Sequence, residues 1–309
     1  MLFQMTKKLF PLLLLIITMT NAQEVKVSSG KVERFENFKS KYVDARNIDV
    51  WLPDGYSNNQ KYAVLYMHDG QMLYDAESAW NKQSWEIDEI AGTLLSENKI
   101  RNCIVVGIWN NGQKRHQEYF PQKPFSKFSD AQKEFISNDL LQKGKINTVF
   151  NPISDNYLQF LVTELKPFID QTYSVKTDQA NTFIAGSSMG GLISMYAICE
   201  YPRIFGGAAC LSTHWTGIYQ LNDNPIPEVL LTYLKANLPN PKNHKLYFDC
   251  GDKTLDSLYP SLQKRADVII QKKGYTSANW TSQYFPGKDH TEKAWQERLH
   301  IPLEFLLKN

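Results

Sequence analysis

The stretch IAGSSMGGLISMY, residues 184–196, carries the most specific structural signal of the sequence. It opens on an apolar run typical of a buried strand and closes on a run typical of a helix, with a G-x-S-x-G pattern between them. A sharp strand-to-helix turn forces the central residue of that pattern into a strained conformation and exposes its side chain above the sheet. Ser188 is therefore the candidate nucleophile, whereas Ser187 occupies the variable position, where a small turn residue suffices.

Strand and helix patterns alternate over the rest of the chain. The apolar runs at 62–67 and 102–109 are typical of strands buried on both faces. Further strands are expected at 32–38, 42–52, 181–185, 205–211, 245–250 and 280–285. Helices are expected at 84–95, 158–169, 192–200, 258–271 and 291–307. This alternation predicts an α/β fold with a mostly parallel central sheet, helices on both faces, and two opening strands antiparallel to the rest.

Two long polar and irregular stretches, 110–155 and 213–243, interrupt this alternation. Each is longer than an ordinary connection, so we expect loop insertions that form a cap or a binding surface. Parallel sheets bind ligands outside the C-terminal ends of their strands, and both stretches follow such ends. The same loops could form a contact between copies of the chain, so the oligomeric state is left open.

The first 22 residues differ from the rest of the chain. Lys7 and Lys8 precede an apolar run at 9–18, and small residues follow it at 20–22. This is the pattern of a secretory signal peptide, and the run is short for a membrane span. We expect cleavage after residue 22, a secreted or periplasmic location, and one mature domain at 23–309. An uncleaved N-terminal anchor is the alternative.

The charge balance argues against some functions. The chain has 34 Lys+Arg and 32 Asp+Glu, and removal of Lys7 and Lys8 with the signal peptide leaves 32 of each. A neutral chain argues against nucleic-acid binding. The four cysteines show no metal-ligand spacing, and we interpret them as buried thiols; a disulfide, for which the sequence assigns no pairing, is the alternative. No metal site and no cofactor are expected.

A serine nucleophile needs a base, and on this fold the chain order is nucleophile, acid, histidine. His290 follows the last expected strand and precedes the closing helix, which is where that base belongs, whereas His214 follows an earlier strand. The acid should follow the strand at 245–250, where the segment DCGDKTLDSLY offers Asp252 and Asp256. Chain order alone does not choose between these two carboxylates.

The chemistry of such a serine also requires two backbone N–H donors for an oxyanion. One donor is the residue after the nucleophile, Met189. The other comes from the loop after the strand at 62–67, which reads HDGQ at 68–71, so Gly70 and Gln71 are the candidates. An ordinary turn with a helix-capping aspartate is the alternative interpretation of this loop.

The loops expected near Ser188 are rich in aromatic and charged side chains. We choose Asp69, Trp109 and Trp215 as candidate substrate-binding residues. Core packing is the alternative for the two tryptophans, because aromatic residues dominate cores. Arg115 could bind a carboxylate, but we interpret it as a solvated surface charge. Further residues expected at this edge are Asp75, Trp80, Trp85, His116, Tyr119 and His214.

Six segments together resemble one known family. They are VLYMHDGQMLYD, VVGIWNNGQKRHQEY, FIAGSSMGGLISMY, YPRIFGGAACLS, LYFDCGDKTLD and GKDHTEKAW. The chain resembles the putative-esterase branch of the α/β-hydrolases, which includes feruloyl and acetylxylan esterases, siderophore esterases and S-formylglutathione hydrolases. The resemblance covers nearly the whole mature chain, and its most specific parts are the GSSMGG turn and the HDGQ strand end.

The resemblance implies Ser188 as nucleophile, His290 as base, and an acid in the GDKTLD loop, whose longer form favours Asp256 over Asp252. It implies hydrolysis through an acyl-enzyme without metal or cofactor. Together with export, it favours an acetyl or feruloyl ester of a carbohydrate as substrate. Hydrolysis of a siderophore ester, which should require more cationic residues near the site, and acyl transfer to a sugar through the same residues are the alternatives.

Overall fold

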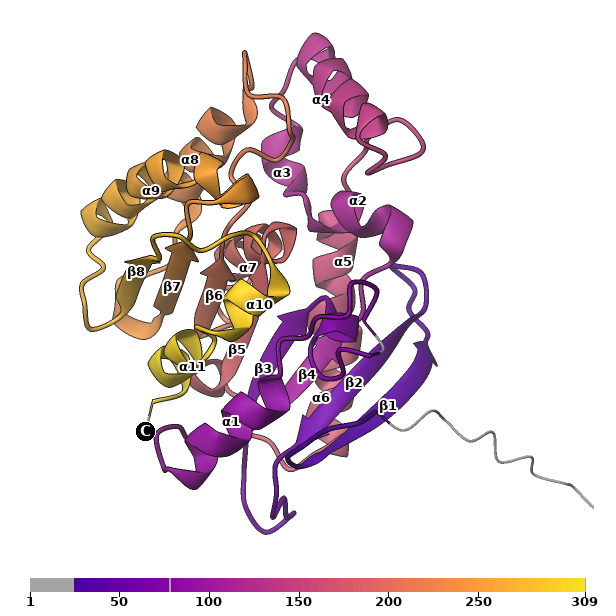
Figure 1. Cartoon of the computed structure of the whole chain (residues 1–309), viewed down its shortest axis with the longest axis vertical. Coiled ribbons are helices and arrows are strands. Elements are labelled where there is room, and N and C mark those ends of the chain that lie inside the picture. Colours follow the sequence, from indigo (N-terminus) through magenta and orange to yellow (C-terminus); the bar gives the residue numbers. More distant parts are fainter. Residues whose placement is uncertain (1–24, 78, 309) are drawn as a thin grey trace, which may run out of the picture.

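A computed structural model describes residues 25–77 and 79–308 of the chain. The predicted signal peptide at 1–22 lies outside these residues. One sheet of eight strands runs through the molecule in the order β1-β2-β4-β3-β5-β6-β7-β8 (Figure 1). The strands are β1 Lys31–Phe38, β2 Arg46–Leu52, β3 Ala63–His68, β4 Cys103–Ile108, β5 Thr182–Ser187, β6 Gly207–Leu211, β7 Lys245–Cys250 and β8 Trp280–Tyr284.

The strand directions confirm the expected α/β class. The strands from β3 to β8 are mutually parallel. β2 pairs antiparallel with β4, and β1 pairs antiparallel with β2. The prediction that both opening strands oppose the rest is therefore wrong for β1. The reason is the short connection between β1 and β2, which makes them antiparallel neighbours and reverses the chain once more.

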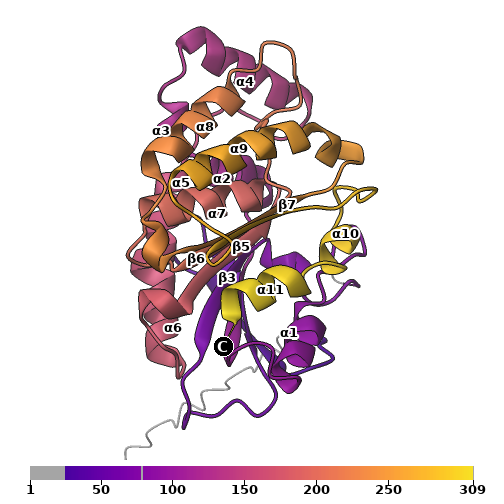
Figure 2. The ribbon, with the colours of Figure 1, turned by 90° about the vertical axis from the view of Figure 1, so that its left-hand side faces the viewer.

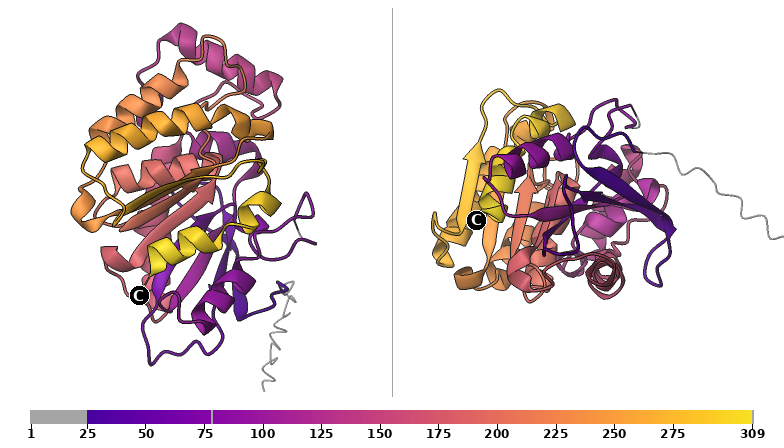
Figure 3. Two further views of the ribbon diagram at one scale, coloured as in Figure 1. Left: turned by 60° about the vertical axis from the view of Figure 1, so that its left-hand side comes forward. Right: turned by 90° about the horizontal axis from the view of Figure 1, so that it is seen from below.

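Helices cover both faces of the sheet (Figures 2 and 3). Alternate residues of β3 enter two different cores, since Val64 and Tyr66 belong to one and Leu65 and Met67 to the other. This two-sided burial explains why the strand reads as a continuous apolar run. The helices are α1 Ile87–Ser96, α2 Arg115–Tyr119, α3 Gln122–Phe125, α4 Asp130–Gln142, α5 Ser154–Phe160, α6 Lys166–Thr172, α7 Met189–Glu200, α8 Ile226–Asn237, α9 Pro260–Lys272, α10 Glu292–Gln296 and α11 His300–Leu307.

Two of the expected helices are interrupted. The one expected at 158–169 consists of α5 and α6 with a π-helical segment, Leu161–Leu165, between them. The closing helix expected at 291–307 is divided into α10 and α11. Pro302 lies in the first turn of α11, which is the only part of a helix that tolerates proline, so a new helix begins just before it. No helix among the described residues is long and apolar enough to cross a membrane.

The two stretches interpreted as irregular contain helices that the sequence analysis missed. The first holds α2, α3 and α4, and the second holds α8; Figure 1 places α3 and α4 beyond the upper edge of the sheet. α4 starts with a capping box in which Ser129 and Gln132 satisfy each other's backbone N–H groups. The helices enclose a small aromatic core of edge-to-face rings 5.4–5.9 Å apart, formed by Phe120, Phe125, Phe128 and Phe150.

One polar contact fixes this cap to the sheet, and a second holds its two insertions together. Arg46 of β2 donates to both carboxylate oxygens of Glu118 of α2, at 2.9 and 2.7 Å, and both side chains are buried. Asp139 of α4 accepts the backbone N–H groups of Tyr219 and Gln220, both at 2.9 Å. The second contact joins the two insertions to each other, so they form one packed cap.

The cysteines are buried and unpaired, as expected. Burial raises the pKa of the Cys103 thiol to about 12, which leaves it protonated and unreactive at ordinary pH. Burial also raises the pKa of the three remaining thiols, Cys199, Cys210 and Cys250.

Candidate active site

Ser188 lies in the sharp turn between β5 and α7. Its backbone angles, φ 57° and ψ −120°, fall outside the ordinary helix and strand regions. A residue held in such a region costs about 1–3 kcal/mol. The N–H of Ser188 donates to the carbonyl of Leu211 in β6 at 2.9 Å, which holds the turn against the neighbouring strand. This is the strained strand-to-helix turn that the G-x-S-x-G pattern predicts.

The glycines around Ser188 let two backbone segments touch. A Cβ on Gly186 would lie 2.8 Å from the carbonyl carbon of Gly190. A Cβ on Gly191 would lie 3.0 Å from the carbonyl oxygen of Leu211. The glycines are therefore required by the close packing of the start of α7 against the ends of β5 and β6.

The loop after β8 brings His290 against Asp256. Nδ1 of His290 lies 2.5 Å from Oδ1 of Asp256. Asp252, the alternative acid, points elsewhere, since its carboxylate accepts the hydroxyl of Tyr284 at 2.9 Å and the N–H of Gly287 at 2.8 Å. The geometry thus pairs His290 with Asp256 and not with Asp252.

The second carboxylate oxygen of Asp256 is held by two donors. Oδ2 accepts the hydroxyl of Ser212 at 2.7 Å and the N–H of Gly251 at 2.6 Å. The Ser212 oxygen in turn accepts N–H groups from Trp295 and Arg298, both at 2.9 Å. The carboxylate is therefore fixed in orientation. Sequence reasoning missed Ser212, for which the only signal was its place directly after a strand that ends at this edge.

A buried tyrosine, Tyr259, contacts the Ser188 side chain. Its hydroxyl lies 2.6 Å from Nδ1 of His214, and its ring centroid lies 5.7 Å from that of His290. Burial raises the pKa of the Tyr259 phenol well above its usual value, and a hydrogen bond with Ser188 opposes that rise. Among the described residues no hydrogen bond joins Ser188 to His290.

Two residues with backbone N–H groups suited to an oxyanion line the same cavity as Ser188. Met189 is the first residue of α7, and Gln71 lies in the short 3-10 helix Gly70–Met72. The first N–H groups of a helix have no partner within it. Gly70 instead packs on β4, since a Cβ there would lie 2.6 Å from the carbonyl carbon of Gly107. Gly70 is not among the residues that line the cavity, so Gln71 remains the candidate for the second donor.

Ser188 and His290 line a cavity of about 640 Å³. Trp80 stands at its wall with 81% of its surface exposed. Trp85 and Trp295 also line it and stack on each other, with ring centroids 5.6 Å apart. The lining side chains that come from the two insertions include Asn110, Arg115, His116, Lys145, His214 and Tyr219.

The sequence model of the family described as "Putative esterase" matches residues 41–304, which include Ser188, Asp256 and His290. The chain belongs to this family. It is a carboxylic ester hydrolase with an α/β-hydrolase fold, and its mostly parallel sheet carries the strained turn at Ser188 after β5.

Curated relatives of this esterase are distant in sequence. The uncharacterized protein YbbA of Bacillus subtilis is 22% identical over 269 residues, which cover 84% of this chain and 92% of the relative. An endo-1,4-beta-xylanase/feruloyl esterase of Xylanibacter ruminicola is 23% identical over 294 residues. That match covers 91% of this chain but 32% of the relative, so the esterase spans about a third of that longer protein.

Solved structures share the fold of this esterase. A ferulic acid esterase superposes with a TM-score of 0.63 at 19% identity, covering 90% of this chain and 98% of the other. The enterobactin esterase FES from Shigella flexneri superposes with a TM-score of 0.59 at 15% identity, covering 91% of this chain and 60% of the other. At these identities the similarity concerns the fold.

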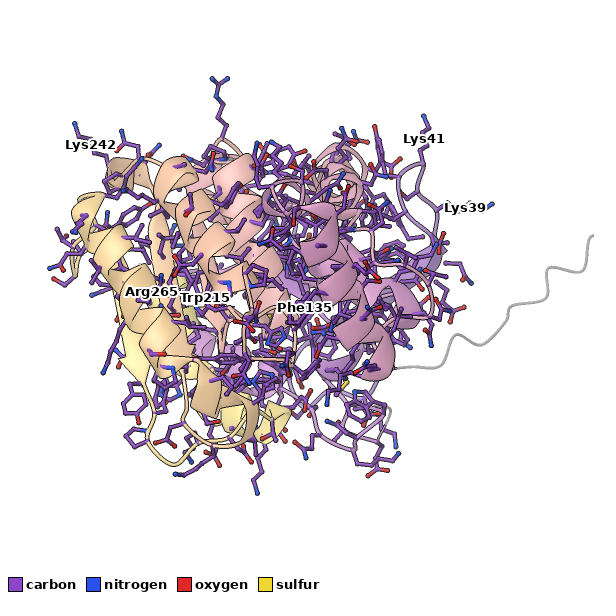
Figure 4. The ribbon with its side chains drawn as sticks, turned by 90° about the horizontal axis from the view of Figure 1, so that it is seen from above. Lys39, Lys41, Phe135, Trp215, Lys242 and Arg265 are labelled. Atoms are coloured by element: carbon purple, nitrogen blue, oxygen red, sulfur yellow. The ribbon has the colours of Figure 1, made fainter. Side chains whose placement is uncertain are left out.

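Two predicted substrate-binding residues do not line the cavity of this esterase. Trp215 is fully buried and donates its indole N–H to Gln263 at 2.9 Å; Figure 4 shows it among the helices, inside the outline of the molecule. Trp109 donates to Asp49 at 2.8 Å and lies under the guanidinium of Arg34, 4.7 Å from its ring centroid. Both predictions are wrong, because packing and internal hydrogen bonds occupy these rings.

The third predicted residue, Asp69, lines the cavity of the esterase, but its carboxylate is occupied. Arg115 donates to its two oxygens at 2.8 and 2.7 Å, and Asn110 donates to one of them at 2.7 Å. Burial lowers the pKa of Arg115, but the charge and hydrogen bonds of Asp69 outweigh it and raise the pKa. With 22% of its side chain exposed, Arg115 is not the solvated surface charge that the sequence suggested.

Proposed function

We propose that this esterase is an exported serine hydrolase that removes an acetyl or feruloyl group from a carbohydrate-linked ester. The observation that carries the proposal is the 2.5 Å contact between His290 and Asp256 on the cavity that Ser188 also lines. The signal-peptide pattern at 1–22 supports a secreted or periplasmic location.

The mechanism follows from the positions of three side chains. Asp256 accepts the Nδ1–H of His290, so Nε2 is free to accept the proton of the Ser188 hydroxyl. Ser188 Oγ then bonds to the ester carbonyl carbon, and the bond from that carbon to the alcohol oxygen breaks as His290 returns the proton to the alcohol. Water then gives a proton to the same imidazole and attacks the acyl carbon, and the bond from that carbon to Ser188 Oγ breaks as His290 returns the proton to Oγ, which releases the acid.

Two further groups complete this mechanism. The Ser188 hydroxyl must donate to Nε2 of His290, and hydrogen bonds of this kind commonly tighten only when substrate binds. The N–H groups of Met189 and Gln71 stabilise the negative charge that develops on the carbonyl oxygen.

The cavity wall supports a carbohydrate as the alcohol. The exposed ring of Trp80 offers a flat apolar surface of the kind that packs on a sugar face. Asn81 and Glu292, which are hydrogen-bonded to each other at 2.7 Å, add polar groups suited to hydroxyls. The relative named as an endo-1,4-beta-xylanase/feruloyl esterase supports the same substrate class.

A second candidate is hydrolysis of a siderophore ester. Arg115 and Lys145 both line the cavity, and a cationic lining attracts anionic substrates. The fold shared with an enterobactin esterase supports this candidate as well. Acyl transfer to a sugar would use the same Ser188, His290 and Asp256.

A panel of esters tests the proposal on the mature chain. Acetyl, feruloyl and longer acyl groups are compared on simple alcohols, on xylo-oligosaccharides and on a catecholate lactone, with Ser188→Ala as background. We expect the highest kcat/KM for an acetylated or feruloylated oligosaccharide. The highest value for the catecholate ester would favour the second candidate, and new sugar esters in place of free acid would favour transfer. No cleavage above the Ser188→Ala background would refute all three.

A further inference from the structure

Part of the cavity wall carries basic side chains that the mechanism does not use. We name Arg115, His116 and Lys145 the basic cluster. All three line the cavity, and all three come from the first insertion, Arg115 and His116 from α2 and Lys145 from the turn after α4. Because they line the cavity and lie outside the sheet, we expect these side chains to contact the molecule that the cavity binds.

Two of the three guanidinium nitrogens of Arg115 are held by hydrogen bonds to Asp69, and the third is not. Nε and Nη2 donate to Asp69 at 2.8 and 2.7 Å. Nη1 makes no hydrogen bond with any described residue between 25 and 308. It is also not one of the described polar atoms that are both buried and without a partner. Its N–H groups therefore remain accessible. A guanidinium held in one plane with free N–H groups is suited to a carboxylate.

Lys145 lines the same cavity as Arg115. Its Nζ is 5.5 Å from the ring centroid of Tyr219, another lining residue. Burial, followed by the positive charges of Arg115 and Lys145, lowers the pKa of His116 to about 3. The His116 imidazole is therefore neutral at ordinary pH, and both cations are near enough to influence it. The same two charges also lower the pKa of His214, after burial and the effect of neighbouring histidines.

Of the two cations, only Arg115 forms an ion pair with a carboxylate of the cavity among the described residues. Asp69 is occupied by Arg115, and Glu292 accepts the side-chain amide of Asn81 at 2.7 Å. Lys145 forms no ion pair with a described residue. Glu292, from α10, keeps its negative charge, but the wall formed by Arg115, Lys145 and Asp69 carries a net positive charge, which favours an anionic group bound against it.

We propose that the basic cluster is a subsite for a carboxylate carried by the substrate, with Arg115 Nη1 and Lys145 Nζ as its donors. The inference rests on the proposed ester hydrolysis and narrows its substrate class. The esterase then acts on esters that carry a carboxylate, either on the acyl half, as in a half-ester of a dicarboxylic acid, or on the alcohol half, as in an acylated uronic acid.

Two matched pairs of esters test this subsite and distinguish the two halves. In the acyl pair, mono-p-nitrophenyl adipate carries a carboxylate and its methyl ester does not. In the alcohol pair, an O-acetylated methyl glucuronoside carries a carboxylate and the corresponding O-acetylated methyl glucoside does not. After subtraction of the Ser188→Ala rate, we expect kcat/KM to be about tenfold higher for the charged member of one pair.

Charge variants of Lys145 test whether the basic cluster causes the preference for the charged ester. Lys145→Gln should lower the charged-to-neutral ratio of kcat/KM by about threefold, and Lys145→Glu should lower it further. Added salt should lower the ratio as well, because it screens the attraction. Lys143→Gln is the matched control, since Lys143 is an exposed lysine two positions away that does not line the cavity, and it should leave the ratio unchanged.

A ratio near one for both pairs in the wild-type esterase would overturn the subsite, and so would a preference that Lys145→Glu leaves intact. Neither result would affect the proposed ester hydrolysis, which is measured by Ser188-dependent cleavage of the neutral members. Failure to cleave any of the esters would overturn both.

Discussion

Asp256 Oδ1 lies 2.5 Å from Nδ1 of His290, whereas the carboxylate of Asp252, in the same loop, accepts a hydrogen bond from the hydroxyl of Tyr284 at 2.9 Å. The two acids differ because the 3-10 helix Thr254–Leu258 turns Asp256 into the interior, while Asp252 stays beside the edge strand β8. One helical turn in the loop after β7 therefore decides which carboxylate reaches the imidazole.

Replacement of the two acids should have very different effects. Asp256→Asn keeps the volume but can no longer hold the Nδ1–H tautomer of His290, so kcat should fall by about 10³- to 10⁴-fold. Asp252→Asn should leave kcat within about twofold, as for most surface substitutions. Steady-state kinetics on p-nitrophenyl acetate measure both. Similar losses in the two variants would contradict the pairing.

Ser212 should act on catalysis through Asp256. Ser212→Ala removes a donor to a buried carboxylate, an interaction of about 1.5–3 kcal/mol, so kcat should fall about tenfold to a hundredfold while KM changes little. Ser137→Ala is the control, because that buried serine accepts the N–H of Phe150 in the cap, away from His290. Both variants should lower the melting temperature. A similar loss of kcat in Ser212→Ala and Ser137→Ala would show that Ser212 affects activity only through the stability of the fold.

Gly186→Ala should disrupt the nucleophile turn. The added Cβ would lie 2.8 Å from the carbonyl carbon of Gly190, and such overpacking costs about 1–3 kcal/mol. We expect both lower stability and loss of activity, measured by urea unfolding and by ester hydrolysis. Gly144→Ala introduces strain at φ 63° with no atom within 4 Å, so it should lower stability alone. Full activity in Gly186→Ala would contradict the packing argument.

Acid should destabilise the fold through buried neutral histidines. Burial lowers the pKa of His68 from 6.5 to about 3, and its Nδ1 lies 2.8 Å from the hydroxyl of Tyr157. Between those two values the unfolded chain binds a proton that the folded chain does not. The free energy of unfolding should therefore fall with decreasing pH, by up to about 1.4 kcal/mol per pH unit for this group. His116 contributes in the same direction.

Urea unfolding at about pH 7 and about pH 5 measures this loss. His68→Gln, which retains a polar partner for Tyr157, should reduce the pH dependence by the contribution of one histidine. The same pH dependence in the variant and the wild type would show that His68 is not the group responsible.

The central sheet could be predicted from the sequence because its strands are buried on both faces. In β3 every residue is buried, and alternate side chains enter opposite cores, so the strand reads as one apolar run. The turn at Ser188 could be predicted as well, because the backbone packs so closely at Gly186 that only glycine fits there. These features depend on local sequence and on packing that any such sheet requires.

The cap and the substrate residues could not be predicted in the same way. α4 buries only part of a largely polar sequence, and α2 and α3 are too short to show a period. Trp215 and Trp109 follow strands at the active-site edge, but sequence does not reveal whether such a ring turns into the cavity or into the core. The pairing of Arg115 with Asp69 depends on contacts 46 positions apart, which no local pattern records.

The identity of the nucleophile is the central claim, and covalent labelling measures it most directly. The wild-type esterase is treated with diethyl p-nitrophenyl phosphate, which phosphorylates activated serines, and the labelled residue is located by mass spectrometry. We expect one adduct, on Ser188, in the wild type and in Ser187→Ala, and neither adduct nor ester hydrolysis in Ser188→Ala. An adduct on Ser187, or hydrolysis retained by Ser188→Ala, would contradict the central claim.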